Sequence, residues 1–193
     1  MALAPHDDFI SEHEACLIQK QAVHLYAYRN GVLKRAPKTE FYRSAPLRYS
    51  WGQHLSNDRY ARKFLAWMEA IARRLHEPVN HAIIIRYHHG TQTHAPWHHD
   101  KCEEHGRKAG CMRADTGFHV VSVGVPRVFQ LGNEAEVVWE CPLPHRSLLS
   151  ISSAANRKWK HCVPPDSTHE GIRWSLIFRT IASPATPRRL RLG

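Results

Sequence analysis

Long apolar runs are absent from this sequence of 193 residues, and no segment approaches the roughly 20 consecutive apolar residues of a membrane-spanning helix. Residues 1–8 have neither the basic nor the apolar part of a secretory signal peptide. No internal repeat or low-complexity tract occurs, which excludes repeat architectures. We therefore expect an intracellular protein, cytoplasmic or nuclear, that does not associate with membranes.

Acidic residues are scarce as well. Asp and Glu number 17 against 27 Lys and Arg, which gives a formal net charge of +10. A chain this basic attracts polyanions, and phosphate backbones are the usual ones, although charge that serves solubility explains the same excess. The five cysteines are an odd number without framework spacing, so reduced thiols fit better than disulfides.

The length and composition are those of one globular domain. Apolar residues make up 42% of the chain, and 193 residues suffice for one well-buried core. We expect a single domain over residues 1–186, a flexible basic tail over residues 187–193, and a monomer.

Helical signals dominate the N-terminal part. Ser11 and Glu14 form a capping box, with Ile10 and Ala15 placed as a hydrophobic staple, so a helix should start at Ser11. Asn30-Gly31 predicts a tight turn between strands at 24–29 and 32–35. A second helix should start at Ser56 or Asn57 and end before Pro78. Its apolar residues recur at helical spacing, namely Tyr60, Phe64, Trp67, Met68, Ile71 and Leu75.

After Asn80 the pattern changes to short β segments separated by turn residues. These segments cover residues 81–87, 118–125, 127–131, 136–140, 146–152 and 172–181. Helices first and strands afterwards predict an antiparallel sandwich or barrel buttressed by helices.

Three residues could hold one metal ion. His98 and Asp100 follow Pro96-Trp97, which should end a loop and begin a strand, and alternate residues of a strand point to the same face. His161 lies 61 residues after Asp100. Two imidazoles and one carboxylate form the facial triad that suits non-haem Fe(II) and leaves coordination positions open, whereas zinc favours a closed tetrahedral site.

Two arginines on the last predicted strand complete the pattern. Arg173 and Arg179 are six residues apart and therefore on one face, and either guanidinium could anchor 2-oxoglutarate through a carboxylate. Each signal has an ordinary alternative: a His-x-Asp arises by chance among 16 histidines, and both arginines could form the outer face of an edge strand. The order of the signals along the chain favours function.

That order, with its surrounding residues, resembles the AlkB family of Fe(II)/2-oxoglutarate dioxygenases. The resemblance spans roughly Phe9 to Ile181, and the joint pattern is far more specific than any single motif. The matching segments are Asn80 to Tyr87 with Gly90, Trp97 to Lys101, Ser122 to Phe129, Ser147 to Leu149, Trp159 to Pro164, and Arg173 to Arg179.

The resemblance implies an α+β protein with a double-stranded β-helix, a cupin-like jelly roll with N-terminal helices and a substrate lid. Fe(II) is then expected at His98, Asp100 and His161. The co-substrate 2-oxoglutarate is expected at Tyr87, Arg173, Ser175 and Arg179. The implied reaction uses O2 to demethylate an N-alkylated base in DNA or RNA and releases succinate, CO2 and formaldehyde.

The sequence departs from the family pattern in two places. Ile85 stands where an Asn often helps hold 2-oxoglutarate. Cys102 stands where many base demethylases have an acidic residue near the target base, and Glu103 and Glu104 follow it. Either the acid that contacts the base has shifted by one residue, or the substrate differs.

Aromatic side chains can stack on an extruded base. Tyr42, Tyr49 and Trp51 resemble the aromatic lid region of the family, although such rings can equally fill a gap between lid and core. Basic residues surround them and could contact phosphates, namely Lys34, Arg35, Lys38, Arg43 and Arg48. The expected substrate-binding residues are Tyr42, Tyr49, Trp51, Cys102 and Glu103.

Three hypotheses stay open at this point. The first is oxidative demethylation of methylated DNA or RNA, and the second is the same chemistry on a protein side chain or a small molecule. The third is a non-catalytic metal or nucleic-acid binding module, in which histidines and cysteines hold zinc. Its candidate ligands are the six histidines from His81 to His99 with Cys102, His105 and Cys111, at a spacing that matches no common zinc signature.

Overall fold

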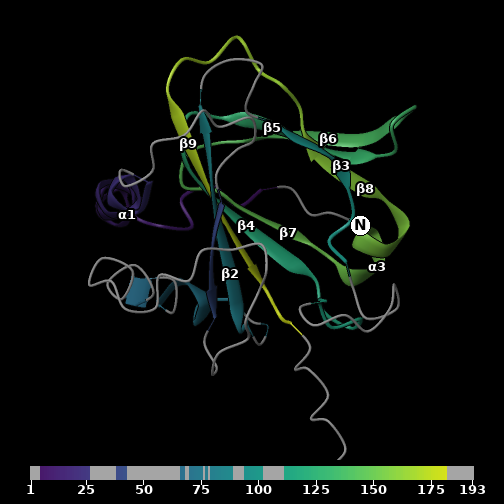
Figure 1. The fold of residues 1–193 in the computed structure, drawn as a ribbon, viewed down its shortest axis with the longest axis horizontal. Helices are drawn as coiled ribbons and strands as arrows, with labels where there is room; N and C mark the ends of the chain where they lie inside the picture. The colour runs from purple at the N-terminus through teal and green to yellow at the C-terminus, as the bar shows by residue number, and fades with distance from the viewer. Residues whose placement is uncertain are drawn as a thin grey trace, which may run out of the picture.

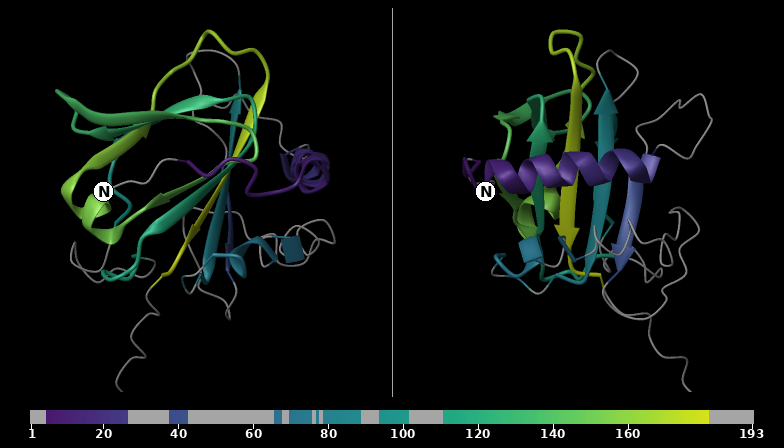
Figure 2. Two further views of the ribbon diagram at one scale, coloured as in Figure 1. Left: turned by 180° about the vertical axis from the view of Figure 1, so that it is seen from behind. Right: turned by 90° about the vertical axis from the view of Figure 1, so that its left-hand side faces the viewer.

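The computed structural model describes residues 5–26, 38–42, 66–67, 70–75, 77, 79–88, 94–101 and 111–181, without the side chains of 23–26 and 38–42. Two antiparallel sheets face each other, as Figure 1 shows. The buried apolar residues between them, which include Phe118, Phe129 and Leu131, form the inner core. The helix α1 crosses the outer face of the larger sheet, as the right-hand view of Figure 2 shows. This arrangement confirms the predicted double-stranded β-helix with an N-terminal helix.

The larger sheet has five strands and the smaller sheet has four. In spatial order the larger sheet contains β1 (Lys38–Tyr42), β2 (His81–His88), β9 (Ile172–Arg179), β4 (Phe118–Gly124) and β7 (Leu148–Ile151). The smaller sheet contains β3 (Ala95–His98), β8 (Lys160–Val163), β5 (Arg127–Gly132) and β6 (Val137–Leu143). The helices with full bounds are α1 (Glu12–Tyr26) and α3 (Ser153–Lys158).

The larger sheet is buried on both faces. Its outer face packs against α1, and its inner face packs against the smaller sheet. The buried apolar residues between α1 and the larger sheet form the outer core, to which Trp174, Leu176 and Phe178 of β9 belong. Because successive strand residues point to opposite faces, the intervening residues of β9 point between the sheets. These inner residues are Arg173, Ser175, Ile177 and Arg179.

The helix α1 begins with the predicted capping box. The Ser11 N–H donates to Glu14 Oε2 at 2.8 Å, and the Glu14 N–H donates to Ser11 Oγ at 3.2 Å. Ile10 and Ala15 are fully buried in the outer core. The predicted strand from residue 24 is wrong in its first three residues, because α1 continues to Tyr26. Each added helical residue gains a backbone hydrogen bond, which outweighs a local turn signal; residues 27–35 lie outside the described ones.

The second predicted helix ends earlier than expected. Residues 66–67 and 70–72 are helical, and Ile71 and Leu75 are buried in the outer core. Pro78 does not end the helix, because a tighter turn already follows residue 72. There the Arg74 N–H donates to the Ile71 carbonyl at 3.0 Å, and Arg74 forms an ion pair with Glu14 of α1.

Four predicted strands agree with β2, β4, β5 and β9 to within two residues at each end. The prediction 136–140 stops three residues before the end of β6, and 146–152 begins two residues before β7. The elements β1, β8 and α3 were not predicted, and they are only five, four and six residues long. Among the described residues, no helix combines the length and the apolar character that crossing a membrane requires.

Candidate active site

Three side chains from two segments of the chain meet at the strand pair β3–β8. The ligand atoms of His98, Asp100 and His161 all lie within 4.8 Å of one another. His98 and His161 are register partners, and their ring centroids are 4.2 Å apart. In the described part of the chain this is the group that could hold a metal ion. Of the described histidines considered for zinc, His98 alone belongs to it. His89, Cys102 and His105 lie outside the described residues.

Asp100 reaches this group by a different route from the predicted one. Strand β3 ends at His98, so alternation along a strand does not place the carboxylate. Instead, the Asn156 side chain holds the Asp100 backbone from both sides. Asn156 Nδ2 donates to the Asp100 carbonyl at 2.8 Å, and the Asp100 N–H donates to Asn156 Oδ1 at 3.2 Å. Asn156 is buried in α3, so this short helix fixes the position of Asp100.

A backbone contact selects the tautomer of His98. Its Nδ1 lies 2.7 Å from the carbonyl oxygen of Pro96, which can only accept a hydrogen bond. Nδ1 therefore carries a proton, and Nε2, which lies 3.9 Å from Asp100 Oδ1, is the nitrogen that can bind a metal. Such outer hydrogen bonds orient metal-binding imidazoles and increase their basicity.

The charges of the group suit a cation. Burial raises the pKa of Asp100, but the positive Arg179 and the neighbouring imidazoles outweigh it, and the pKa lies below its usual value. Burial lowers the pKa of His161 to about 3. The carboxylate is therefore ionised and the His161 imidazole is neutral, which are the forms that bind metals. The His161 Nδ1 is buried without a hydrogen-bond partner among the described residues.

Arg179 and Arg173 lie at opposite ends of the inner face of β9. Arg179 NH1 is 3.2 Å from Asp100 Oδ2, so this guanidinium stands at the metal ligands. Its Nε donates to His81 Nδ1 at 2.8 Å. His81 is buried and is the register partner of Arg179 on β2, so it fixes the guanidinium that faces Asp100.

Arg173 is a fully buried cation. One terminal nitrogen donates to Ser122 Oγ at 2.9 Å, while Nε and NH1 have no hydrogen-bond partner among the described residues. Burial lowers its pKa to about 10, so the group stays charged at neutral pH. A buried cation with two unused donors is costly unless an anion binds to it. Arg173 therefore fits a carboxylate ligand.

The other residues expected at 2-oxoglutarate lie beside Arg173. Tyr87 is its register partner on β2, and the Arg173 Cζ lies 5.4 Å from the centre of the Tyr87 ring. Ser175 is buried and pairs with Ile85 on one side and Ser122 on the other. The expected co-substrate residues thus form one inner surface that extends from the metal group to Arg173.

The residues expected at the substrate fall largely outside the description. Tyr42 is the last residue of β1, opposite His81, and its side chain is not described. This segment is therefore an edge strand of the larger sheet. Tyr49, Trp51, Cys102 and Glu103 lie outside the described residues.

Asn156, His81 and Arg127 are buried polar residues of this region for which no role at the metal group or the co-substrate was predicted. Of these three residues, only Asn156 could have been located from a local sequence signal. Ser152 before Ser153 is a favourable helix N-cap, and its Oγ accepts the Ala155 N–H at 3.2 Å. Recognising α3 would have placed Asn156 within one turn of the strand that carries His161.

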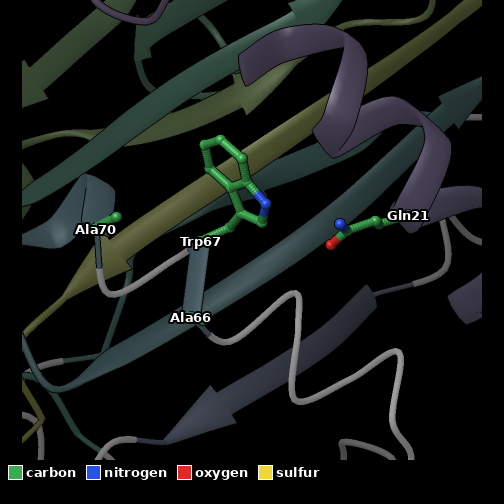
Figure 3. Close-up of a pocket in the computed structure, with 4 residues that line it drawn as sticks. All are labelled: Gln21, Ala66, Trp67 and Ala70. Atoms are coloured by element: carbon green, nitrogen blue, oxygen red, sulfur yellow. The ribbon is translucent and has the colours of Figure 1, made fainter. Parts of the chain in front are cut away.

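A separate hollow of about 470 Å³ lies on the outer side of the larger sheet. Figure 3 shows the Gln21 amide of α1 directed toward the indole of Trp67, with Ala66 and Ala70 completing the lining. None of the metal-group residues lines this hollow.

Replacing Asn156 by alanine tests its support of Asp100. We expect Asn156→Ala to weaken binding of Fe(II), or of Mn(II) as a redox-stable probe, by about 10- to 100-fold, the usual effect of removing an outer-shell partner. Anaerobic calorimetry measures this. Asn133→Ala is the matched control, because Asn133 also hydrogen-bonds backbone N–H groups but lies in the β5–β6 turn. Equal metal affinity in the two variants would contradict the assignment.

Comparison with known proteins gives one family match. Residues 10–192 match the model of the 2OG-Fe(II) oxygenase superfamily. No curated protein matches the chain. Among solved structures, a Trichoplax adhaerens prolyl hydroxylase in complex with a hypoxia inducible factor oxygen degradation domain peptide fragment has a TM-score of 0.54 at 14% identity, covering 92% of this chain and 82% of that chain. A Pseudomonas putida prolyl-4-hydroxylase has a TM-score of 0.52 at 12% identity, covering 92% and 91%.

Proposed function

Because the chain belongs to the 2OG-Fe(II) oxygenase superfamily, we propose that it removes methyl groups from the nitrogen atoms of bases in DNA or RNA, as an AlkB-like enzyme. The protein is an Fe(II)/2-oxoglutarate-dependent dioxygenase, which uses Fe(II), 2-oxoglutarate and O2. This membership overturns the hypothesis of a non-catalytic module. The substrate and the role of each residue are our proposal.

The donor set fits the family's metal. His98, Asp100 and His161 would hold Fe(II) with two nitrogens and one oxygen, which leaves positions for the co-substrates. Bound Fe(II) with 2-oxoglutarate and O2 supplies an oxidation in which one oxygen atom enters succinate, the other enters the substrate, and CO2 leaves. Arg179 keeps Asp100 ionised and oriented, and Asn156 holds its backbone.

The inner surface of β9 fits the co-substrate. Arg173 would receive the distal carboxylate of 2-oxoglutarate, because its Nε and NH1 have no protein partner in the described part of the chain. Tyr87 lies beside Arg173 on β2, and Ser175 lies between Arg173 and Arg179 on β9. Tyr87, Arg173 and Ser175 are buried, and an ionic contact is stronger in a buried environment than in water.

Oxidation of an N-methyl group explains demethylation without further catalytic groups. The oxygen atom converts N–CH3 into N–CH2–OH. The hydroxyl proton then passes to the nitrogen, the C–N bond breaks with its electron pair remaining on nitrogen, and formaldehyde leaves. The base is restored with hydrogen in place of methyl.

The charge beside the metal ligands is the observation that carries the choice of nucleic acid. Lys101 directly follows Asp100, and Arg157 and Lys158 directly follow Asn156; all three side chains are exposed. Residues 141–165, which include His161, contain no Asp or Glu. Positive charge near the opening of a site attracts phosphate backbones, and the AlkB-like order of motifs agrees with this substrate.

The test uses DNA and RNA oligonucleotides that carry N-methylated adenine or cytosine. We expect succinate and formaldehyde in equal amounts, in reactions that depend on the methyl group. Arg157→Glu should raise the KM for the oligonucleotide by about 10-fold, with 2-oxoglutarate affinity unchanged, because a phosphate contact is replaced by repulsion. Lys20→Glu is the matched control, since it makes the same charge change on an exposed residue of α1.

Two outcomes count against this substrate. If no methylated oligonucleotide is turned over while a peptide or small molecule is oxidised, the second hypothesis replaces the first. Equal effects of Arg157→Glu and Lys20→Glu would show that net charge alone, and not the charge beside the metal ligands, governs binding.

A further inference from the structure

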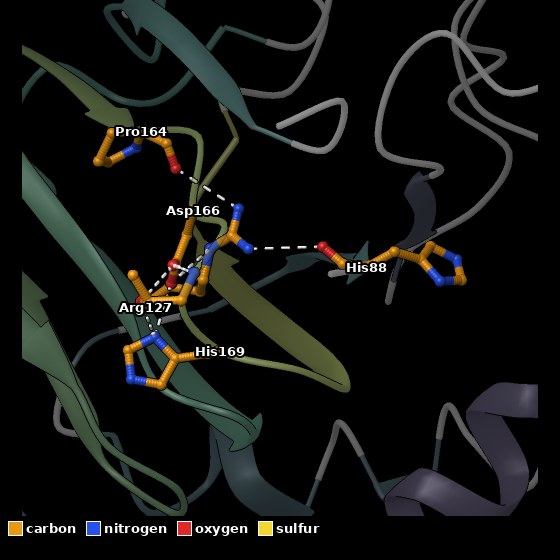
Figure 4. Close-up of polar contacts among 6 residues, drawn as sticks. His88, Arg127, Pro164, Asp166 and His169 are labelled. Carbon is orange, nitrogen blue, oxygen red and sulfur yellow. Dashed lines mark hydrogen bonds and ion pairs between the residues drawn. The ribbon is translucent and has the colours of Figure 1, made fainter. Parts of the chain in front are cut away.

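A second buried arginine, Arg127, lies near Arg173 and links the two sheets. Arg127 is the first residue of β5, and its side chain is 1% exposed. It donates from NH1 to the His88 carbonyl and from NH2 to the Pro164 carbonyl, both at 3.4 Å. As Figure 4 shows, the guanidinium thereby joins the end of β2 in the larger sheet to the segment that follows β8 in the smaller sheet.

Asp166 holds the remaining side of Arg127. Its Oδ2 lies 3.8 Å from Arg127 Nε and accepts from His169 Nδ1 at 2.8 Å. Its Oδ1 accepts from the Thr168 N–H at 2.8 Å and from Thr168 Oγ1 at 2.7 Å. These hydrogen bonds, led by the one from the Thr168 side chain, lower the pKa of Asp166 well below its usual value. Arg127 is therefore paired with a carboxylate that is itself fixed in the β8–β9 loop.

Two guanidinium groups lie close to the aromatic ring of Tyr87. The Cζ of Arg127 is 5.7 Å from the centre of its ring, and the Cζ of Arg173 is 5.4 Å from it. Attraction between a cation and an aromatic ring is favourable when it is desolvated, and Tyr87 is 2% exposed. Arg127 thus braces the ring that Arg173 packs against.

The charges around Tyr87 do not balance. Asp166 compensates Arg127, whereas Arg173 has a hydroxyl partner, Ser122, and no ion pair with an acidic residue in the described part of the chain. The two cations repel each other, and one more carboxylate would relieve this repulsion. The distal carboxylate of 2-oxoglutarate would supply that charge.

We propose that Arg127 is a positioning residue of the co-substrate pocket, which holds Tyr87 and Arg173 in the arrangement that receives the distal carboxylate of 2-oxoglutarate. Each of its nitrogens faces a protein oxygen, so Arg127 acts through Tyr87 and the two sheets and does not itself bind the ligand. The proposal concerns the family's co-substrate and is independent of the proposed nucleic-acid substrate.

The test compares two ligands that differ only in the distal carboxylate. Binding of 2-oxoglutarate and of 2-oxopentanoate to the Mn(II)-loaded protein is measured anaerobically by calorimetry, with no substrate present. In Arg127→Met we expect 2-oxoglutarate to bind about 10-fold more weakly, as for other supporting residues, and 2-oxopentanoate to change less than about 2-fold. Asp166→Asn should show the same selectivity to a smaller extent, and it replaces Arg127→Met if that variant does not fold.

Two control variants distinguish the position of Arg127 from its charge as the cause of the effect. Arg113→Met removes an exposed arginine that pairs with Asp115 and should change neither affinity. Arg127→Lys keeps the charge but not the forked geometry, so it should recover only part of the lost affinity. Equal weakening of both ligands, no change in either, or full recovery in Arg127→Lys would overturn the proposal. Because no oligonucleotide is used, its failure is distinguishable from failure of the proposed function.

Discussion

His161→Ala reduces succinate formation to less than about 1% of the wild-type rate and weakens metal binding by more than about 100-fold. Removing a residue that hydrogen-bonds to a metal ligand already lowers metal affinity by about 10- to 100-fold, so removing the ligand itself lowers it further. The imidazole is 5% exposed and packs against Phe118 and Phe129, with ring centroids 5.0 and 5.4 Å away. Anaerobic calorimetry with Mn(II) and a succinate assay measure the two effects.

His119→Ala is the matched control for this variant. His119 is also a buried histidine of the sheets, 8% exposed, with Nδ1 2.8 Å from Ser150 Oγ, and it lies outside the metal group. Both variants remove an imidazole from a packed interior and should lose stability to a similar degree. Metal affinity should remain only in His119→Ala. If the two variants bind Mn(II) equally, His161 is not a ligand.

Arg173→Met has two opposite effects. It raises the Kd for 2-oxoglutarate by about 100-fold or more, because the unused donors Nε and NH1 would each lose a charged hydrogen bond. Each such bond contributes about 1.5 to 3 kcal/mol, and tenfold in affinity corresponds to about 1.4 kcal/mol. It also stabilises the ligand-free protein, because a fully buried cation without an acidic partner is replaced by an apolar side chain of similar length. Calorimetry and thermal unfolding without ligand measure the two effects.

The expected rise in Tm is about 2 to 8 °C. Replacing buried charges by apolar groups stabilises a protein by about 1 to 4 kcal/mol, and each kcal/mol raises the Tm of a chain of this size by about 2 °C. Arg113→Met, on an exposed residue, should change neither quantity. A variant with lowered Tm and unchanged affinity would show that Arg173 is a structural residue and not the site of a carboxylate.

Much of the fold follows from local sequence. The capping box at Ser11 sets the start of α1, and apolar runs bounded by turn residues give β2, β4, β5 and β9 to within two residues. These signals succeed because each lies within one element. The helix α3 and the strand β8 are too short for a period to show, and β8 contains Lys160 and His161 among only four residues.

The site is harder to predict from the sequence alone. Its metal group was predicted because the residue types and their order are distinctive, but the support of Asp100 comes from Asn156, which is 56 residues away. Arg127 was predicted to start a strand but had no predicted role at the site, and two of its partners, His88 and Pro164, are 39 and 37 residues distant. Contacts of this kind depend on how the two sheets pack, and no local pattern encodes them.

The structure also separates the two arginines that sequence analysis treated as equivalent. Spacing places Arg173 and Arg179 on one face of β9, but spacing does not show what each side chain meets. Arg179 pairs with Asp100 and His81, whereas Arg173 lies beside Tyr87 and Ser122. One guanidinium therefore serves the metal ligands, and the other fits the far end of the co-substrate.

The central claim is that His98, Asp100 and His161 hold one Fe(II) that also binds 2-oxoglutarate. The most direct measurement is an anaerobic titration of the purified protein with Fe(II) and then 2-oxoglutarate, followed by visible absorption. We expect the weak charge-transfer band of the Fe(II)–2-oxoglutarate chelate, saturating at one Fe(II) per chain and missing in His161→Ala. Absence of the band in the wild-type protein, or a band that persists in His161→Ala, would contradict the claim.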